Sequence, residues 1–145
     1  MALTDNKIIR SKQSPLKTKV KLASGLIHVY KGAHLALNSG GYAVLASDAL
    51  ALKYAGIALE EVNLTAAVNS ADGLFDVLVL RNESLEIVEM DVTSNITIAN
   101  LEAAVYMDTD EKVDIGSGIA FSTTLGRVGV IKEFISTNKA WVQMT

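Results

Sequence analysis

Short runs in which apolar and polar residues alternate follow one another along most of the chain. A period of two is typical of β-strands, because successive side chains of a strand point to opposite faces of the sheet. Clusters of Gly, Asn, Asp and Ser separate these runs at intervals of about 8–12 residues, as in all-β domains. The predicted strands cover residues 26–30, 33–37, 42–46, 54–59, 74–81, 85–92, 105–107, 127–135 and 139–144. The pattern therefore predicts a mostly β fold, either a β-sandwich or a small β-barrel.

The strongest turn signal lies between the second and third of these strands. Residues 38–41 read Asn-Ser-Gly-Gly between two alternating runs, which predicts a β-hairpin. We expect Gly40 in this turn, and Gly56 in a later strand, to be positions where a side chain does not fit. The most apolar strand, 74–81, is expected to be buried on both faces, and the strand 85–92 is expected to return after a turn.

Two segments interrupt the strand pattern with residues that permit a helical turn. Ser47 is a suitable N-cap for a turn that runs to Leu52. Residues 97–104 carry apolar positions at helical spacing, so we expect a short helical turn before the strand that starts at Val105.

The first 24 residues differ from the rest of the chain. They are polar and basic, are broken by Ser14-Pro15, and have no sustained period of either kind. This predicts a flexible basic N-terminal arm, residues 1–24, before a single β-rich domain, residues 25–145. Lys17 to Leu22 alternates weakly, and this segment is expected to form a strand where a sheet edge is offered to it.

Charge is distributed unevenly along the chain, whose net charge is −3. Residues 1–21 contain six basic residues and one acid, Asp5, whereas the remainder contains seven basic and fifteen acidic residues. A basic arm on an acidic body favours docking on an acidic protein surface, and a solvated arm that maintains solubility is the alternative. Direct nucleic-acid binding is disfavoured, because the arm has no aromatic residue to stack on bases and the body is acidic.

The residue content excludes several classes of protein. The chain has no cysteine, which excludes disulfides, thiolate metal sites and cysteine nucleophiles, and which suits a protein made in a reducing cytosol. Lysines and an arginine interrupt the N-terminus, so it has no apolar signal core. No apolar run reaches the ~20 residues needed to span a bilayer, and no membrane association is expected.

Metal-binding patterns are incomplete. His28 and His34 lie in neighbouring predicted strands, but no third ligand is indicated, so we interpret them as ordinary surface or core-edge histidines. The spacing of Asp108, Asp110 and Asp114 resembles a calcium loop. The EF-hand pattern nevertheless fails, because its sixth position requires Gly and its twelfth requires Glu. We therefore predict a charged hairpin tip and no metal.

Patterns for catalysis and for phosphate binding are also incomplete. Residues 116–118, Gly-Ser-Gly, lack the Gly-Lys-Ser/Thr triplet of a phosphate-binding loop and are interpreted as a turn. No serine lies in a Gly-x-Ser-x-Gly elbow. The paired acids Glu60-Glu61 and Glu86/Glu89 carry no geometry that indicates a catalytic dyad. We predict that the protein is not an enzyme and has no cofactor.

The order of these strands and turns resembles the small capsid decoration (cement) proteins of tailed bacteriophages. The resemblance covers about residues 26–144, and its matched segments are 29–44, 54–58, 105–110, 126–131 and 141–144. The segments contain, in order, a Lys-Gly break with a Gly-rich turn, an Ala-Gly-x-Ala element, Val-Tyr before an acidic tip, a Gly-x-Val-Gly-x-Val strand and a final strand. One departure precedes Val105, where the family usually has a Gly in a tight turn and this chain has Leu101-Glu102-Ala103-Ala104.

The resemblance implies a small β-barrel-like or β-tulip-like domain with a flexible arm. It implies a structural virion protein that binds the outer surface of the capsid and stabilises the head. The expected partners are the major capsid protein and two further copies of the chain, as a homotrimer at threefold or quasi-threefold sites. The arm would add a strand to a capsid protein. The arm residues expected to bind the capsid are Lys7, Arg10, Lys12, Lys17, Lys19, Val20 and Lys21.

Two rivals remain open at the level of sequence. One is another virion component of similar β fold, such as a head fibre base or a tail-tube protein. The other is a hydrolase on a β-barrel, which would need a pocket with two carboxylates, or a carboxylate and a histidine, within hydrogen-bond reach. If the arm acts as expected, deletion of residues 1–20 leaves a folded body and weakens capsid binding.

Overall fold

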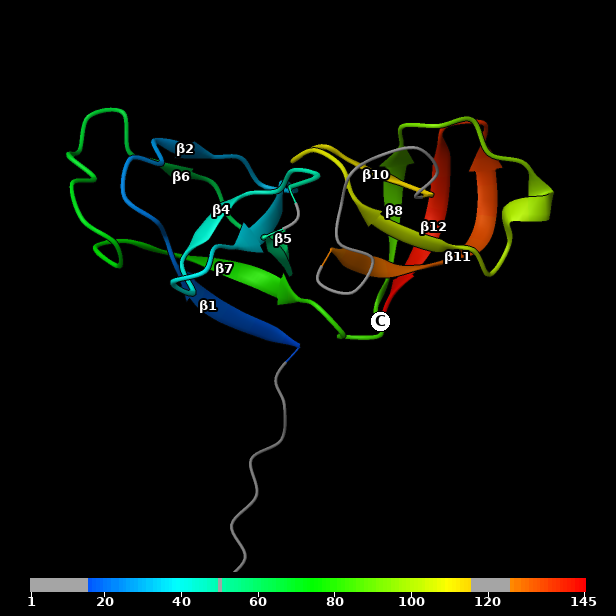
Figure 1. The fold of residues 1–145 in the computed structure, drawn as a ribbon, viewed down its shortest axis with the longest axis horizontal. Coiled ribbons are helices and arrows are strands. Elements are labelled where there is room, and N and C mark those ends of the chain that lie inside the picture. The colour runs from blue at the N-terminus through cyan, green and yellow to red at the C-terminus, as the bar shows by residue number, and fades with distance from the viewer. Residues whose placement is uncertain (1–15, 50, 116–125) are drawn as a thin grey trace, which may run out of the picture.

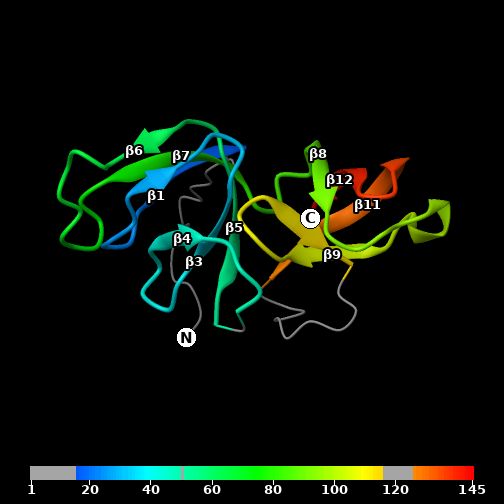
Figure 2. The same cartoon turned by 90° about the horizontal axis from the view of Figure 1, so that it is seen from above.

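Strands dominate the regular structure of the protein. The computed structural model describes residues 16–49, 51–115 and 126–145. These residues form twelve strands and one 3₁₀ turn, so the predicted mostly β fold is confirmed, and so is the presence of a β-barrel. The strands are divided between two larger sheets that lie side by side along the long axis of the molecule (Figures 1 and 2).

The first sheet comes from the N-terminal half of the chain and has five antiparallel strands. Their spatial order is β1 (Lys17–Lys21), β7 (Asp76–Arg81), β5 (Lys53–Ala58), β3 (His34–Leu37) and β4 (Ala43–Leu45). The sheet curls until Leu22, just after β1, forms a parallel bridge with Ala43 of β4. The outermost strands of the sheet, β1 and β4, therefore come together at the Leu22–Ala43 bridge.

The second sheet is a closed barrel. Its order is β10 (Lys112–Asp114), β8 (Ile87–Val92), β12 (Lys139–Met144), β11 (Arg127–Ser136) and β9 (Ala104–Met107), which pairs with β10 again. The β10–β8 pair is parallel, and the other pairs are antiparallel. A separate two-stranded sheet joins β2 (His28–Val29) to β6 (Val62–Asn63), and η1 (Ile98–Asn100) is the 3₁₀ turn.

Two apolar clusters form the core, and one of them joins the sheets. The barrel cluster contains Val105, Met107 and Val142, and it also contains Tyr54 and Ile57 of the first sheet. The other cluster lies within the first sheet and includes Leu22 and Leu35. The strand β5 thus contributes side chains to both clusters, which fixes the first sheet against the barrel by apolar burial.

Most of the predicted strands are present, but two details differ. The hairpin β3–β4 is confirmed, with Leu37 paired with Ala43. In β7 the predicted burial on both faces is only half right, because Val77 and Val79 are fully buried whereas Leu78 and Leu80 are half-buried. The strand β8 does not return along β7 but enters the barrel, after two residues with positive φ, Glu83 and Leu85.

The two expected helical turns have different outcomes. The described residues between Ser47 and Leu52 form a bend and a turn, without helix. The Ser47 hydroxyl there accepts only the N–H of Ala49, at 3.4 Å, which is a local turn. The second turn is confirmed as η1, where the Thr97 hydroxyl accepts the N–H of Ala99 and the Asn100 side chain accepts the N–H of Thr97.

The predicted arm needs a correction at its C-terminal end. Residues 17–21 form β1 in the protein's own sheet, paired with β7, and Leu22 and Ala23 are buried. The reason is that β7 offers an edge to this weakly alternating segment, and Leu22 gains a place in the core. The rest of the predicted arm, residues 1–15 with Lys7, Arg10 and Lys12, lies outside the described residues. Within the described ranges, no helix has the length and hydropathy required to cross a membrane.

Candidate functional site

The first candidate surface is the strand β1, where four of the expected arm residues lie. Its alternation leaves Lys17, Lys19 and Lys21 exposed, whereas Thr18 and Val20 are half-buried on the other face. The Lys19 Nζ lies 3.7 Å from Asp76 Oδ1, and both side chains are about half exposed or more. Such an exposed pair contributes little to stability, so the lysine row remains available to a partner.

Beside β1, the curled sheet is open. A cavity of about 180 Å³ lies between β1 and the strands across the curl. Thr18 and Val20 line one side, and Leu37 and Lys53 line the other. The buried Oδ1 of Asn82, which also lines this cavity, has no hydrogen-bond partner among the described residues. Within those residues, β1 itself pairs only with β7, and β4 approaches its other side only after β1 ends, at the Leu22–Ala43 bridge. The other edge of β1 before this bridge is free to accept a strand.

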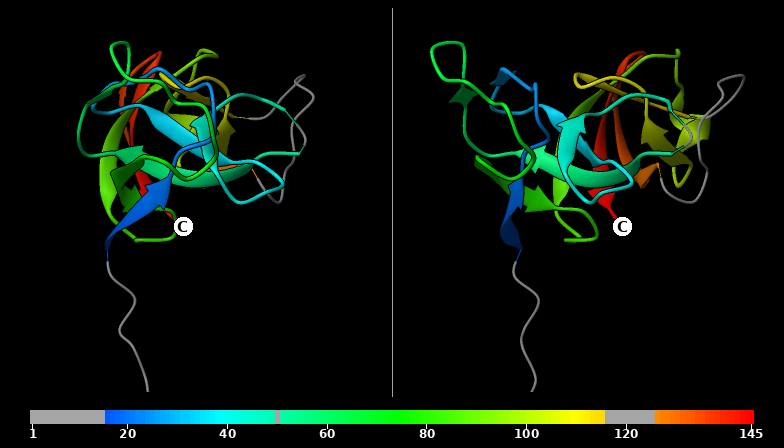
Figure 3. Two further views of the ribbon diagram at one scale, coloured as in Figure 1. Left: turned by 90° about the vertical axis from the view of Figure 1, so that its left-hand side faces the viewer. Right: turned by 60° about the vertical axis from the view of Figure 1, so that its left-hand side comes forward.

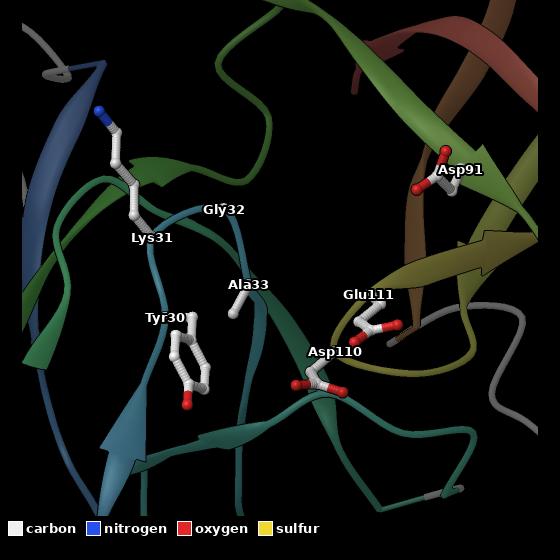
Figure 4. Close-up of a pocket in the computed structure, with 7 residues that line it drawn as sticks. All are labelled: Tyr30, Lys31, Gly32, Ala33, Asp91, Asp110 and Glu111. Carbon is white, nitrogen blue, oxygen red and sulfur yellow. The ribbon is translucent and has the colours of Figure 1, made fainter. Parts of the chain in front are cut away.

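The second candidate surface is a groove between the first sheet and the barrel. Two cavities of about 320 and 390 Å³ share Gly32, Asp91 and Glu111 and therefore adjoin each other. One wall is the loop between β2 and β3, and the other is formed by β8 with the β9–β10 tip. Figure 4 shows the carboxylates of Asp91, Asp110 and Glu111 on the barrel side of the first cavity, with Lys31 directed away from them.

The groove carries an excess of negative charge. Lys139 Nζ lies 3.3 Å from Glu89 Oε1 and 3.7 Å from Asp91 Oδ1, so it offsets part of the charge on β8. Asp110 and Glu111 have no ion-pair partner in the described part of the chain. Carboxylates in a concave site attract cationic groups more strongly than carboxylates on a convex surface, because the protein walls focus the field.

His34 lies in the wall of the second cavity and is only 3% exposed. Its Nδ1 is 2.8 Å from the hydroxyl oxygen of Tyr54. Burial lowers the pKa of His34 to about 4, although the negative charges of Asp110 and Asp91 act to raise it. Burial also raises the pKa of Tyr54. Both side chains are therefore neutral at pH 7, and His34 Nε2 has no hydrogen-bond partner among the described residues.

The structure separates the histidines that the sequence places in neighbouring strands. His28 lies at the surface, with its Nε2 2.8 Å from Glu61 Oε1 and its ring stacked on Tyr30 at 3.9 Å between centroids. His34 is buried on β3. Across the described ranges, no group of three or more His, Cys, Asp or Glu residues has the arrangement to hold a metal ion.

The three aspartates near the β9–β10 tip have separate structural roles. Asp108 accepts a hydrogen bond from the Thr93 hydroxyl, and Asp114 is buried and accepts the N–H groups of Ser94 and Ile115. The carbonyl of Asp110 accepts the N–H of His34, at 2.7 Å. This contact ties the tip to the first sheet, so the predicted hairpin tip is present. The Gly-Ser-Gly turn at 116–118 lies outside the described residues.

The paired acids do not form a dyad. Glu60 Oε1 accepts the backbone N–H of Leu78, at 2.9 Å, whereas Glu61 pairs with His28. The groove residues come instead from three distant segments, near residues 30–34, 89–91 and 110–111. The only sequence signals for this site were the acidic tip and the Lys-Gly break at 31–32. Nothing in the sequence indicated that these two segments lie side by side in the fold.

No protein-family model matches this chain, and no curated protein matches it. The resemblance to phage decoration proteins therefore stays a prediction, and the geometry of β1 and of the groove carries the functional interpretation.

Proposed function

We propose that this chain is a structural virion protein that binds the outside of a tailed-phage capsid and stabilises it. The observation that carries the proposal is the strand β1, which combines a free edge with a row of exposed lysines. The sequence resemblance to decoration proteins supports the same role. The proposal includes a homotrimer at threefold or quasi-threefold positions, as the resemblance implies.

The structure changes the form of the expected contact. Because β1 already belongs to the protein's own sheet, a capsid segment adds to the free edge of β1 rather than β1 leaving to join a capsid sheet. Each main-chain hydrogen bond in such a pair contributes about 0.5–1.5 kcal/mol net. The added strand would lie beside the open cavity and cover the half-buried Val20, so apolar burial strengthens the contact.

The lysine row gives this contact its specificity. Lys17, Lys19 and Lys21 point to the outer face of β1, where they would meet acidic side chains of the capsid. Opposite charges on the two surfaces accelerate association and reject basic partners, and this effect weakens as salt rises. Edge lysines also discourage β1 of one copy from pairing with β1 of another, which keeps the edge available.

The direct test is co-sedimentation with DNA-filled heads that lack this protein. The full chain is expected to co-sediment at micromolar concentration. The triple variant Lys17→Glu, Lys19→Glu, Lys21→Glu is expected to bind at least about tenfold more weakly, because three attractive contacts become repulsive. A charge-matched control, Lys112→Glu, Arg127→Glu, Lys132→Glu, changes basic residues away from β1 and is expected to bind as the unmodified chain does.

Either of two results would count against the proposal. Absence of binding by the unmodified chain at micromolar concentration would remove the capsid role itself. Equal loss of binding in the two triple variants would show that net charge, and not the edge of β1, governs the contact.

A further inference from the structure

We propose that the groove between the first sheet and the barrel binds the basic N-terminal segment, residues 7–12, of a second copy of this chain. The site is distinct from the edge of β1 and does not depend on capsid binding. It assigns Lys7, Arg10 and Lys12 to a contact between copies, whereas β1 remains for the capsid.

The groove has the chemistry to hold a cationic side chain. Asp110 and Glu111 are carboxylates without an ion-pair partner in the described residues, and Asp91 shares only one lysine, Lys139, with Glu89. A guanidinium or ammonium group between such carboxylates forms charge-assisted hydrogen bonds. The ring of Tyr30, 62% exposed at the rim, offers a second surface for a cation.

A second observation also points to a ligand. His34 is nine-tenths buried, it lines the second cavity, and its Nε2 is unpartnered among the described residues. Nε2 is therefore a polar atom in the cavity wall that is available to hydrogen-bond a bound polar group. The wall around it is partly apolar, formed by Ile57, Val88 and Met90. The groove therefore suits a segment that carries both cationic and apolar residues.

The N-terminal segment has this composition. Residues 7–12 read Lys-Ile-Ile-Arg-Ser-Lys, with two isoleucines between the first two cations. Residues 1–15 contain three basic residues and one acid, whereas the chain after residue 21 has about twice as many acids as basic residues. Segments 17–22 and 127–132 also combine cations with apolar residues, but they belong to β1 and β11, so residues 7–12 are the occupant that we assign.

The position of β1 favours a neighbouring copy as the source of the segment. The strand β1 lies in the lower part of Figure 1, whereas the β2–β3 loop and the β9–β10 tip lie in its upper part, and both views in Figure 3 agree. Residues 7–12 lie five to ten positions before Lys17, so they reach at most about 17–36 Å from the start of β1, which is enough to reach a molecule beside it. Such a contact joins unlike surfaces, and it closes into a ring where the rotation between copies permits. The expected trimer is one such ring.

The test measures the solution mass of the full chain by light scattering across concentrations, without capsids. The unmodified chain is expected to form a closed oligomer. The arm variant Lys7→Glu, Arg10→Glu, Lys12→Glu and the groove variant Asp110→Lys, Glu111→Lys are each expected to be monomeric. Circular dichroism checks that both remain folded, and the milder groove variant Asp110→Asn, Glu111→Gln is expected to raise the dissociation constant in the same direction.

The decisive measurement uses a mixture of the two variants. The basic segment of the groove variant matches the acidic groove of the arm variant, and the acidic segment of the arm variant matches the lysines of the groove variant. An equimolar mixture is therefore expected to form oligomers in which the two variants alternate. One chain with all five charge reversals is expected to recover the oligomer, because the reversed charges again match.

Three results would overturn the proposal. The first is a monomeric unmodified chain, as expected if the segment docks in the groove of its own molecule. The second is an arm variant that forms the same oligomer as the unmodified chain. The third is a mixture of the two variants that remains monomeric. Because no capsid enters this experiment, its failure is distinguishable from a failure of the capsid role.

Discussion

The Nδ1 of His34 and the hydroxyl of Tyr54 are joined by a hydrogen bond of 2.8 Å, and both side chains are buried where the first sheet packs on the barrel. Their strands, β3 and β5, are neighbours, with Ala36 paired with Tyr54. Tyr54 belongs to the barrel cluster, although it comes from the other sheet. This polar contact therefore lies within the apolar junction of the two sheets.

Loss of the Tyr54 hydroxyl is expected to destabilise the protein. The substitution Tyr54→Phe leaves a buried histidine nitrogen without its partner, at a cost of about 1–3 kcal/mol. Urea unfolding measures the change in the free energy of unfolding. Tyr30→Phe is the matched control, since that ring is 62% exposed, and it is expected to be nearly neutral. Equal stability of the two variants would show that the His34–Tyr54 bond contributes nothing.

Stability is expected to fall as pH falls from about 6.5 to about 4. The folded state lowers the pKa of His34 to about 4, so the unfolded chain binds a proton at a higher pH than the folded chain does. The histidine therefore favours folding above its unfolded pKa, and about 3 kcal/mol of this contribution is lost by pH 4.

The comparison that isolates this effect uses His34→Gln. Urea unfolding between pH 7 and pH 4 is expected to show a smaller loss of stability in His34→Gln than in the unmodified chain. His28→Gln changes the surface histidine paired with Glu61 and is expected to keep the full loss. A pH dependence that is identical in all three chains would contradict the assignment to His34.

Two glycines are expected to resist any larger residue. A Cβ at Gly56, whose φ is +144°, would collide with the carbonyl of Leu80, and a Cβ at Gly129 would collide with the carbonyl of Gln143. Overpacking against backbone costs about 1–3 kcal/mol or more. Gly56→Ala and Gly129→Ala are therefore expected to lower the melting temperature more than Gly25→Ala, which has positive φ but open space around it.

Gly40 was expected to be a position where a side chain does not fit, and the structure supports this through a close contact and not through its φ. The left-handed residue of the 38–41 turn is Gly41, at φ +85°, and Gly40 has no positive φ. A Cβ at Gly40 would lie 3.3 Å from the Tyr42 ring, which is tight but can relax by a small movement of that side chain. The composition of residues 38–41 predicted a turn correctly, but it did not indicate which of the two glycines has positive φ.

Leu85 offers a route to greater stability. Leu85 lies in the segment that leads from the first sheet into the barrel. Its backbone is in the left-handed region, at φ +64°, and its side chain is 62% exposed. This conformation costs a branched residue about 1–2 kcal/mol relative to glycine. Leu85→Gly is thus expected to raise stability by about 1 kcal/mol. Leu85→Ala keeps the backbone cost while removing the side chain, and an equal gain in that control would assign the effect to the exposed leucine.

The boundary of the N-terminal segment has a direct test. Deletion of residues 1–15 keeps β1 and is expected to lower the melting temperature by no more than the loss of the proposed contact between copies. Deletion of residues 1–21 removes β1, which covers one edge of β7 beside the buried Val77 and Val79, and is expected to destabilise the fold. This replaces the expectation that loss of residues 1–20 is harmless to the body. Similar stability of both deletions would show that β1 contributes nothing to the sheet.

Several features of the fold were predictable because they depend on residues close together in the chain. The alternation at 33–37, the Gly-rich turn and the strand after it predicted the β3–β4 hairpin, and Thr97 with Asn100 makes a local capping box that forms η1. The length of β11 and β12 and the turn between them were also readable, since a hairpin needs only its own residues. The mostly β character follows from the same local signals.

Tertiary structure alone decided how these pieces join. Alternation does not name a partner strand, so the sequence did not indicate that β8 pairs with β12 rather than β7, or that β5 contributes to both clusters. It also did not bring Asp91 and Asp110 to the same groove, or place His34 behind them, because those residues meet only through the packing of the two sheets. The sequence by itself determined the strands and the charge of the N-terminal segment. The tertiary structure decided which edge stays free and which acids face one cavity, since both depend on contacts between residues far apart in the chain.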